Sequence, residues 1–571
     1  MKTIYSCTKK VLGSISALML ALSFTSCEDF LSITPTNDIV LENFWTEEAD
    51  VYSVVNGCYA QLENSDCISR MIVWGELRSD NMTNGSGTPN DILQILKENI
   101  LETNSYTKWD CFYQCINRCN TVLHYAPEVN KIDPNFTDSE LRATMAEVTV
   151  LRALCYFYLI RAYRDVPYVT EPSIDDNIEF MAPATKFDAI LDSLITDVEA
   201  VKENAVRSYG ERSVENTTRI TRWAAYTLLA DLYLWKGNYQ ACIDNCDKVI
   251  SHMKEIYDEE LEENPSSMTL ELYGEYPLIS ECPSGSTNAG NTYSEIFGKG
   301  NSLESIFELN FIERQSVSNS SVGNFYGSTS NTAGQIAAPS YLINEAISGN
   351  NTYFKKTDCR FLENMREESS KVYITKYVYE DVSFRTSTTT GAAPTVNHSS
   401  RNENMANWII YRFSDVLLMK AEAEVELAGN IVPTDTISAE QTQHYRKAFS
   451  CVSAIWKRAN NKRISTVDTL VYGDYSGSRI TMEDLIFDER QREFMFEGKR
   501  WFDFVRLCRR EGDNNRMIQK VLPKFEENSS QIRIKLSSAD ALYFPYNRQE
   551  LKVNTQLSQN PAYILDDSFK K

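Results

Sequence analysis

The chain has 571 residues, of which 42% are hydrophobic, 24% charged and 11% aromatic. These fractions are typical of a globular protein and disfavour disordered, collagen-like and coiled-coil classes. With 57 Lys and Arg against 79 Asp and Glu, the net charge is −22. This charge disfavours a nucleic-acid partner, because phosphate binding needs a basic face.

The N-terminal segment has the form of a secretory signal. Three lysines precede an apolar run from residue 11 to residue 24, and small residues follow before Cys27. An apolar run of about 14 residues is too short to cross a hydrocarbon core, which needs about 20. The sequence therefore predicts a signal peptide over residues 1–26 and an exported protein.

A cysteine at the predicted cleavage point is the feature of a lipoprotein signal, in which that thiol is acylated. Phe24-Thr25-Ser26-Cys27 departs from the usual Leu-Ala-Gly-Cys form at its small positions, so ordinary cleavage beside a chance cysteine is the alternative. Removal of 1–26 leaves a net charge of 54 − 79 = −25, which an anionic lipid surface repels. We predict a lipid anchor on Cys27 that a protein partner assists, because one acyl chain holds only marginally.

The remaining cysteines follow a helical spacing. Cys111, Cys115 and Cys119 recur every four residues, as do Cys242 and Cys246. Side chains four residues apart on a helix have Cβ atoms about 5–6 Å apart, too far for a disulfide. We interpret these residues as small buried apolar side chains and predict no metal site, because Cys-x-x-Cys pairs are absent and the four histidines are scattered.

Helical periodicity dominates the rest of the chain. The clearest unit runs from 221 to 250: two apolar stripes flank a Gly237-Asn238 turn, in the manner of a tetratricopeptide repeat. A similar unit begins at Asp415 and resumes over 445–459, and a third pairs 147–163 with 187–200. Such units cannot bury their apolar faces alone, so we predict that they stack.

Two long segments, 260–340 and 381–405, differ from the helices in composition. They are rich in Gly, Ser, Thr and Asn, with interspersed Tyr and Phe. Loops of this length are functional or disordered, and their aromatic content favours ordered loops.

The densest charge cluster lies between Thr481 and Arg506. Thr481 and Asp484 predict a helix start, and Glu489, Glu493 and Glu497 fall four residues apart. Stacked carboxylates raise each other's pKa and suggest acid/base catalysis. Arginines and lysines alternate with them in the sequence, which favours a structural ion-pair network instead.

The sequence contains no nucleophile elbow, zinc-protease helix or phosphate-binding loop. The absence of these motifs lowers the expectation of an enzyme. Paired carboxylates for glycoside hydrolysis stay an open alternative.

Several motifs, taken in order, give the chain a family resemblance. They are Cys27-Glu28-Asp29-Phe30-Leu31, Glu76-Leu77-Arg78-Ser79-Asp80-Asn81, the helix from Leu151 that exits through Arg164-Asp165-Val166-Pro167, Ser305-Ile306-Phe307-Glu308-Leu309, Arg412-Phe413-Ser414-Asp415-Val416-Leu417-Leu418-Met419, Glu489-Arg490-Gln491-Arg492-Glu493, Phe496-Glu497-Gly498-Lys499-Arg500-Trp501-Phe502-Asp503, Phe544-Pro545 and Gln559-Asn560-Pro561-Ala562-Tyr563. The chain resembles the SusD/RagB family of outer-membrane nutrient-binding lipoproteins nearly end to end.

The resemblance implies an all-α fold of stacked tetratricopeptide-like helix pairs with long irregular loops. It implies one SusD-like domain over 27–571, with an N-terminal half at 27–255 and a loop-rich insertion and C-terminal half at 256–571. It also implies a SusC-like TonB-dependent transporter as partner, a lipid-anchored place on the outer membrane facing the exterior, no cofactor and a scaffold role for the 489–497 carboxylates.

The ligand site is expected from loops near the 76–81 motif and from the middle of the chain, as in the resembled family. Sugars present apolar faces to aromatic rings and hydroxyl groups to polar side chains. The candidates for ligand binding are Arg78, Asp80, Asn81, Tyr293, Phe325 and Tyr326. For Arg78 and Asp80 a structural salt bridge is an equal alternative, and a loop aromatic is more often packed than ligand-binding.

The resulting functional prediction is a non-enzymatic lipoprotein that captures oligosaccharides and passes them to the transporter. One alternative keeps the fold and takes peptides as ligand. Another, from a different class, is a surface glycoside hydrolase or peptidase.

Overall fold

The computed structural model describes most of the chain after residue 43. The described residues are 44–173, 181–211, 213–283, 286, 288–311, 318–328, 332–343, 354, 358–385, 395–401, 405–430, 438–460, 470–525 and 527–564. The predicted signal peptide, 1–26, and the predicted anchor Cys27 lie outside them.

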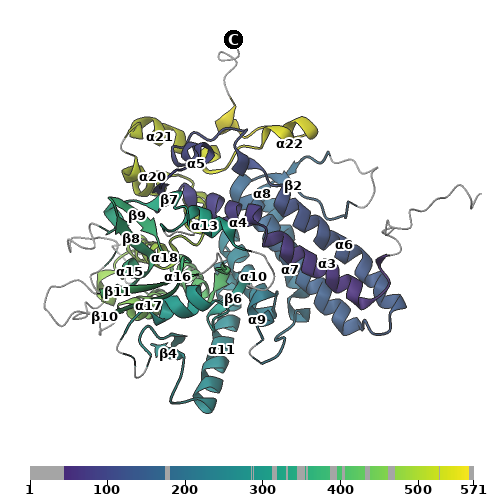
Figure 1. Cartoon of the computed structure of the whole chain (residues 1–571), viewed down its shortest axis with the longest axis horizontal. Coiled ribbons are helices and arrows are strands. Elements are labelled where there is room, and N and C mark those ends of the chain that lie inside the picture. The colour runs from purple at the N-terminus through teal and green to yellow at the C-terminus, as the bar shows by residue number, and fades with distance from the viewer. Residues whose placement is uncertain are drawn as a thin grey trace, which may run out of the picture.

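Helices make up most of the described structure (Figure 1), and the prediction of an all-α, tetratricopeptide-like fold is confirmed. The helices of the first half are α3 (Glu48–Leu62), α4 (Ser65–Ile72), the π-helix η2 (Val73–Leu77), α5 (Asn90–Leu96), η3 (Ser105–Thr107), α6 (Asp110–Ile132), α7 (Asp138–Tyr163), α8 (Phe187–Val201), η4 (Lys202–Asn204), α9 (Glu215–Thr218), α10 (Arg222–Lys236) and α11 (Tyr239–Glu263). Those of the second half are α12 (Asn291–Tyr293), η5 (Ser294–Lys299), α13 (Ser320–Phe325), α15 (Arg360–Asn364), α16 (Phe413–Ala428), α17 (Ala439–Ala459), η7 (Tyr472–Asp474), α18 (Arg479–Phe494), α19 (Arg500–Glu511), α20 (Asn515–Val521), η8 (Leu522–Lys524), α21 (Ser529–Leu536), η9 (Ala539–Leu542), α22 (Arg548–Val553) and η10 (Pro561–Tyr563).

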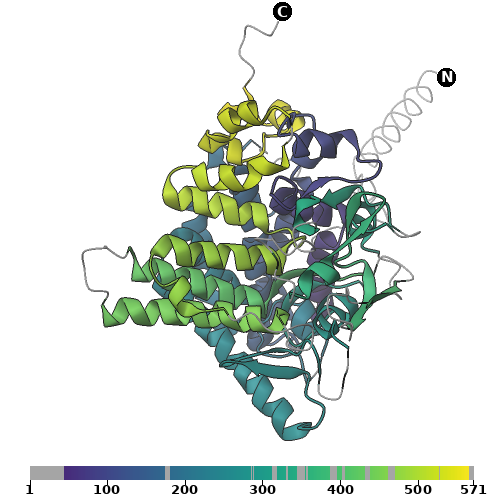
Figure 2. The ribbon, with the colours of Figure 1, turned by 90° about the vertical axis from the view of Figure 1, so that its left-hand side faces the viewer.

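The three predicted helix pairs are α7 with α8, α10 with α11, and α16 with α17. Gly237 ends α10 with φ 78°, a left-handed conformation that suits glycine, and the Asn238 side chain caps α11. Helix α11 packs against α16, so the second and third pairs stack as predicted. Figure 2 shows the later helices, from green to yellow, stacked on one side of the molecule and the strand-rich segments on the other.

Helix α7 is the central core helix of the first half. By length and apolar composition it is the one helix of the described residues that meets the criterion for a membrane span, yet 89% of its apolar window is buried inside the protein. Helices α6 and α8 pack against it, and a capping box of Thr137 and Glu140 fixes its start. Its apolar surface is therefore satisfied by protein packing.

Short antiparallel strands run through the two segments that the sequence predicts to be irregular loops, and further short strands lie outside them. The largest sheet has the order β1 (Thr83–Asn84), β7 (Ile336–Ala338), β9 (Lys371–Ile374), β8 (Met365–Glu368); the pairs are β2 (Val166–Pro167) with β3 (Ala184–Thr185), β4 (Leu270–Tyr273) with β5 (Tyr276–Ile279), β6 (Ser305–Leu309) with β12 (Trp408–Arg412), and β10 (Tyr379–Arg385) with β11 (Thr395–Ser400). Strand β6 pairs with β12 in a register that places Leu309 opposite Trp408. These strands are ordered because they bury apolar side chains: all four residues of β5 are buried.

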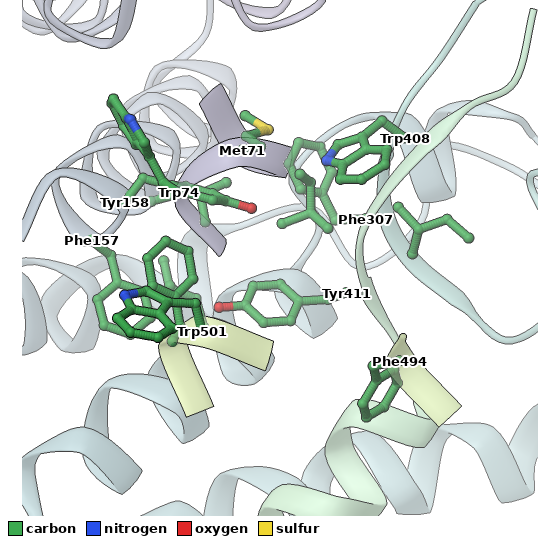
Figure 3. Close-up of a cluster of buried hydrophobic side chains, with 14 of the residues drawn as sticks. Met71, Trp74, Phe157, Tyr158, Phe307, Trp408, Tyr411, Phe494 and Trp501 are labelled. Carbon is green, nitrogen blue, oxygen red and sulfur yellow. The ribbon is translucent and has the colours of Figure 1, made fainter. Parts of the chain in front are cut away.

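The core is continuous between the two halves of the chain. Figure 3 shows Trp74 of η2 and Tyr158 of α7 in one cluster with Trp408 and Tyr411 of β12 and Trp501 of α19. The backbones also meet there, because a Cβ atom on Gly75 would overlap the carbonyl group of Gly498. Glycine at Gly75 thus permits a close approach between η2 and the turn before α19.

Helix α18 differs from the sequence expectation at both ends. It begins at Arg479, one turn before the predicted start, because the Ser478 hydroxyl accepts the backbone N–H of Thr481. It ends at Phe494, so Glu497 does not continue the helical face of Glu489 and Glu493. Positive φ values at Phe496 and Gly498 (69° and 71°) turn the chain, and Glu497 returns to the same cluster of charges.

Candidate functional site

The polar residues predicted to bind ligand lie in the core. Arg78 donates to Glu98 Oε2 at 2.6 Å and to the carbonyl of Ala541, and its guanidinium lies 4.1 Å from the ring of Trp501. Asp80 accepts two hydrogen bonds from Arg500 at 3.0 Å each. Both side chains are fully buried. The salt-bridge alternative is therefore what the structure shows for both residues.

Asn81 and Tyr326 are brought together, but inside the protein. Asn81 donates to Glu76 Oε1 at 2.7 Å, and the same oxygen accepts the backbone N–H of Phe496. The Tyr326 hydroxyl donates to the Phe496 carbonyl at 3.0 Å. The network joins η2 to the turn after α18, which is a structural role.

The three aromatic candidates are packed inside the protein, which is the alternative that the sequence analysis gave for loop aromatics. Tyr293 and Tyr326 are fully buried and Phe325 is 2% exposed. The Tyr293 hydroxyl donates to the Thr375 carbonyl at 2.8 Å, and Phe325 packs against Tyr106. Gly/Ser-rich segments bury these rings because their small residues let the backbone pack closely around them. A ligand-binding role for the six predicted residues would require these side chains to become accessible.

The carboxylates of 489–497 form an ion-pair network, as predicted. Glu493 contacts Arg360 at 2.9 Å and Arg412 at 2.5 Å, and it also pairs with Arg458. Glu489 pairs with Arg360 and Arg492, and Glu497 with Lys376 and Arg412. Burial would raise the pKa of Glu493, but Arg458, Arg412 and Arg360 outweigh it and hold the pKa well below the usual range. An ionised carboxylate with three cations has no proton to supply as a general acid.

The twelve described cysteines are free thiols and all are buried, which confirms their interpretation as small core residues. Burial is the largest cause that raises the pKa of Cys67 and of Cys119, so neither is a reactive thiolate. Within the described ranges no group of three His, Cys, Asp or Glu side chains is arranged to hold a metal ion.

Two of the hollows among the described residues are open and large enough to be candidates for a ligand site. One, which we call the α17 cleft, has a volume of about 290 Å³ and lies between the β4–β5 hairpin, the outer face of α17 and η7. Its lining residues are Tyr273, Gly274, Arg446, Phe449, Ser450, Ser453, Ala454, Lys457 and Tyr472. The other, the charged pocket, has a volume of about 600 Å³ and is lined by Glu426, Gly429, Asn430, Arg479, Arg510, Glu511, Asp513, Asn515 and Arg516.

The charged pocket neutralises its own charges. Arg479 contacts Glu426 and Glu483 at 2.9 Å each, and Arg510 contacts Glu483 at 2.7 Å. Burial and a hydrogen bond with Glu483 raise the pKa of Glu426 to about 8. The carboxyl groups of Glu426 and Glu483 are within hydrogen-bond contact, closer than the roughly 5 Å or more that glycosidases keep between theirs. This pair therefore does not have the spacing of a glycosidase pair.

The α17 cleft has the chemistry of a surface that stacks flat, polar molecules. Helix α17 starts at a capping box of Ser438 and Gln441, and its outward stripe presents the residues from Arg446 to Lys457 at helical spacing. Phe449 lies edge-on to Tyr472, with ring centroids 5.4 Å apart. Ser450 and Ser453 supply hydroxyl groups beside the rings. Ser450 is half-buried and Ser453 is buried. Half-buried rings beside the Ser450 hydroxyl and the exposed Arg446 and Lys457 match the apolar faces and hydroxyl edges of sugars.

The sequence reasoning missed this cleft, although part of its signal is present in the sequence. Along α17, residues 446, 449, 450, 453, 454 and 457 recur at intervals of three and four, opposite the apolar stripe that predicts the helix. The contribution of Tyr273 comes from a hairpin far away in the sequence, and no local pattern indicates that contact.

Comparisons with known proteins agree with this architecture. Residues 304–563 match the model described as the SusD family, and residues 29–234 match the model described as starch-binding associating with outer membrane. This chain is a SusD-like protein. A relative from Formosa agariphila, "SusD-like protein P25", is 26% identical over 97% of this chain and 99% of its own length.

Solved structures show the same fold. A SusD superfamily protein from Bacteroides thetaiotaomicron matches with a TM-score of 0.63 and 19% identity, over 91% of this chain and 99% of the other. The surface glycan-binding protein A from Bacteroides uniformis matches with a TM-score of 0.59 and 18% identity, over 90% of this chain and 100% of the other. At these identities the likeness establishes the SusD-like fold of this chain and nothing about its ligand.

Proposed function

We propose that this SusD-like protein is a non-enzymatic lipoprotein of the outer membrane that faces the exterior, binds oligosaccharide nutrients and delivers them to a SusC-like TonB-dependent transporter. The observation that carries the ligand class is the α17 cleft, which is lined by the rings of Tyr273, Phe449 and Tyr472 together with Ser450. The family description that names starch binding at the outer membrane, and the glycan-binding name of one similar structure, support the same class.

A binding role fits the cleft better than a catalytic role. Among the nine lining residues there is no carboxylate, thiol or imidazole, so the cleft has no carboxylate pair for glycoside hydrolysis and no histidine or carboxylate beside its serines to activate them. A protein that holds nutrient at the mouth of a transporter raises the local concentration of that nutrient there. Delivery then needs binding and release but no chemical step.

The first test is calorimetric titration of the wild-type protein with a panel of soluble oligosaccharides, followed by Tyr472→Ala and Phe449→Ala. Aromatic stacking is worth about 1–3 kcal/mol per ring for nucleic-acid bases, and a sugar at the low end of that range predicts binding five- to tenfold weaker, by about 1 kcal/mol. Tyr233→Ala is the matched control, because Tyr233 is a partly exposed tyrosine of α10 outside the cleft.

Other outcomes separate the alternatives. Binding of peptides but not of oligosaccharides would support the same role with a peptide ligand. Release of shorter products from a glycan or a peptide would show a hydrolase. Unchanged oligosaccharide affinity in both cleft variants would show that the glycan site lies elsewhere on the protein.

The second test concerns the anchor. We expect Cys27→Ala to release the protein from outer-membrane fractions of cells that lack the transporter, and to leave its melting temperature unchanged. The reason is that an acyl chain on the N-terminal cysteine holds the protein from outside the folded core. Equal membrane recovery of wild type and variant would contradict the lipid anchor.

A further inference from the structure

The α17 cleft gathers positive charge in a protein that is strongly negative overall. Arg446 and Lys457 are exposed on the outward stripe of α17 and both line the cleft. Eleven residues of helix separate them, a distance of about 16 Å along the axis. The chain as a whole has a net charge of −22, so two cations at one hollow run against the average of the surface.

Neither cation is neutralised by a carboxylate in the part of the chain that the structure describes. Two other cations of α17 are paired with carboxylates: Lys447 lies 3.6 Å from Glu424, and Arg458 lies 2.6 Å from Glu304. Arg446 instead lies over the ring of Tyr472, with its guanidinium carbon 4.9 Å from the ring centroid. A guanidinium stacked on a ring keeps its edge N–H groups available for a carboxylate or another oxyanion.

The acidic residues of the β4–β5 hairpin and of η7 do not line the cleft. Glu271 accepts hydrogen bonds from Tyr273 at 3.1 Å and Ser280 at 2.7 Å, and Glu275 pairs with Lys254. Asp474 of η7 is exposed. The nine lining residues therefore include two cations and no carboxylate.

The arginines of the charged pocket, unlike Arg446 and Lys457, are already paired with carboxylates. All three are bound in this way, as shown above for Arg479 and Arg510 and as Arg516 is to Asp484 at 2.6 Å. An anion that entered this pocket would have to displace those carboxylates. Among the described residues, no carboxylate has to be displaced from Arg446 or Lys457.

We propose that the α17 cleft selects negatively charged oligosaccharides, in which sugar rings stack on Tyr472 and Phe449 while carboxylate or sulfate groups contact Arg446 and Lys457. This inference rests on the proposed function, since it specifies the class of glycan for the same site. The helical spacing of the two cations suits a ligand with an acidic group on more than one sugar.

The experiment compares oligosaccharides matched in length: a neutral one, one that contains uronic acids and one that carries sulfate esters. Each is titrated into the wild type, Arg446→Gln, Lys457→Gln and the double variant. We expect the double variant to bind at least one acidic ligand about tenfold more weakly and the neutral ligand with less than a twofold change. Higher salt should weaken only the acidic ligand.

Lys447→Gln is the control, because Lys447 is the next residue on α17, is exposed and does not line the cleft. It should leave all affinities unchanged. The uronate and sulfate arms identify which oxyanion is recognised, and a response in either arm supports the proposal.

The failures are distinguishable. If Tyr472→Ala weakens binding but the double charge variant binds acidic and neutral ligands as the wild type does, the charge inference is overturned and the glycan site stands. If Tyr472→Ala and Phe449→Ala change nothing, the proposed site itself fails. If acidic binding is lost in Arg479→Gln rather than in the cleft variants, the charged pocket is the anion site and the inference is also overturned.

Discussion

Lys457 and Arg458 are consecutive residues of α17 with opposite environments. Arg458 is buried and pairs with Glu304 and Glu493 in the core. Lys457 is exposed, lines the α17 cleft and forms no salt bridge with any residue that the structure describes. One step along a helix turns a side chain by about 100°, so the same type of charge serves the scaffold on one face and is available to a ligand on the other.

The inner face shows why buried cations belong to the scaffold. Moving a charge out of water costs several kcal/mol, and only well-placed partners offset that cost. Arg412, Arg360 and Arg458 all meet Glu493, and each is almost completely buried. On the outer face no such constraint exists, because water solvates Arg446 and Lys457.

The largest expected effect is a difference in stability between variants of two neighbouring residues, one on each face of α17. Arg458→Ala should lower the free energy of unfolding by about 3–5 kcal/mol, because it leaves the buried Glu304 without its cation and removes one of the three cations that contact Glu493. Lys457→Ala should change it by less than about 0.5 kcal/mol, as a substitution on the exposed surface. Urea denaturation followed by circular dichroism measures both. Similar losses in the two variants would remove the distinction between the faces.

The second prediction tests the inner face through pH. Burial would raise the pKa of Glu497, but Arg412 and Lys376 outweigh it and lower the pKa to about 2. A lowered pKa means that ionised Glu497 stabilises the fold above its unfolded-state pKa of about 4.3, and that this stability is lost as the pH falls toward 2. At pH 7 Glu497→Gln should cost on the order of 3 kcal/mol.

Melting curves of wild type and Glu497→Gln at a series of pH values measure this difference. The gap in melting temperature should be widest above pH 5 and should narrow as the pH falls below about 4. Glu128→Gln serves as the control, since its side chain is 63% exposed and its pair with Lys131 lies at the surface. A gap that stays constant with pH would argue against the charge of Glu497 as the source of its contribution.

The smallest effect tests the aromatic residues that the sequence predicted to bind ligand. Tyr326→Phe removes the hydrogen bond to the Phe496 carbonyl and should cost about 1 kcal/mol of stability. Oligosaccharide affinity should not change, because Tyr326 is fully buried. Thermal melting and calorimetry measure the two properties separately. Weakened binding at unchanged stability would restore Tyr326 as a ligand residue.

The local features of the sequence predicted the helical framework well. The apolar stripes on either side of Gly237 predicted α10 and α11, and the composition of the 489–497 segment predicted an ion-pair network. Both depend on interactions within a few turns of chain or on the number of opposite charges available. The predicted signal peptide and the acylation of Cys27 stay predictions, because they lie outside the described residues.

Burial was decided by the tertiary structure alone. The sequence places Arg78 and Asp80 beside a predicted loop as candidates for ligand binding. In the structure they lie in the core, where they pair with Glu98 and Arg500. The α17 cleft likewise needs Tyr273 of a hairpin to meet Phe449 of a helix 176 residues later. A sequence records which side chains share one face of a helix, but which faces water can still reach depends on segments that are distant along the chain and adjacent only after folding.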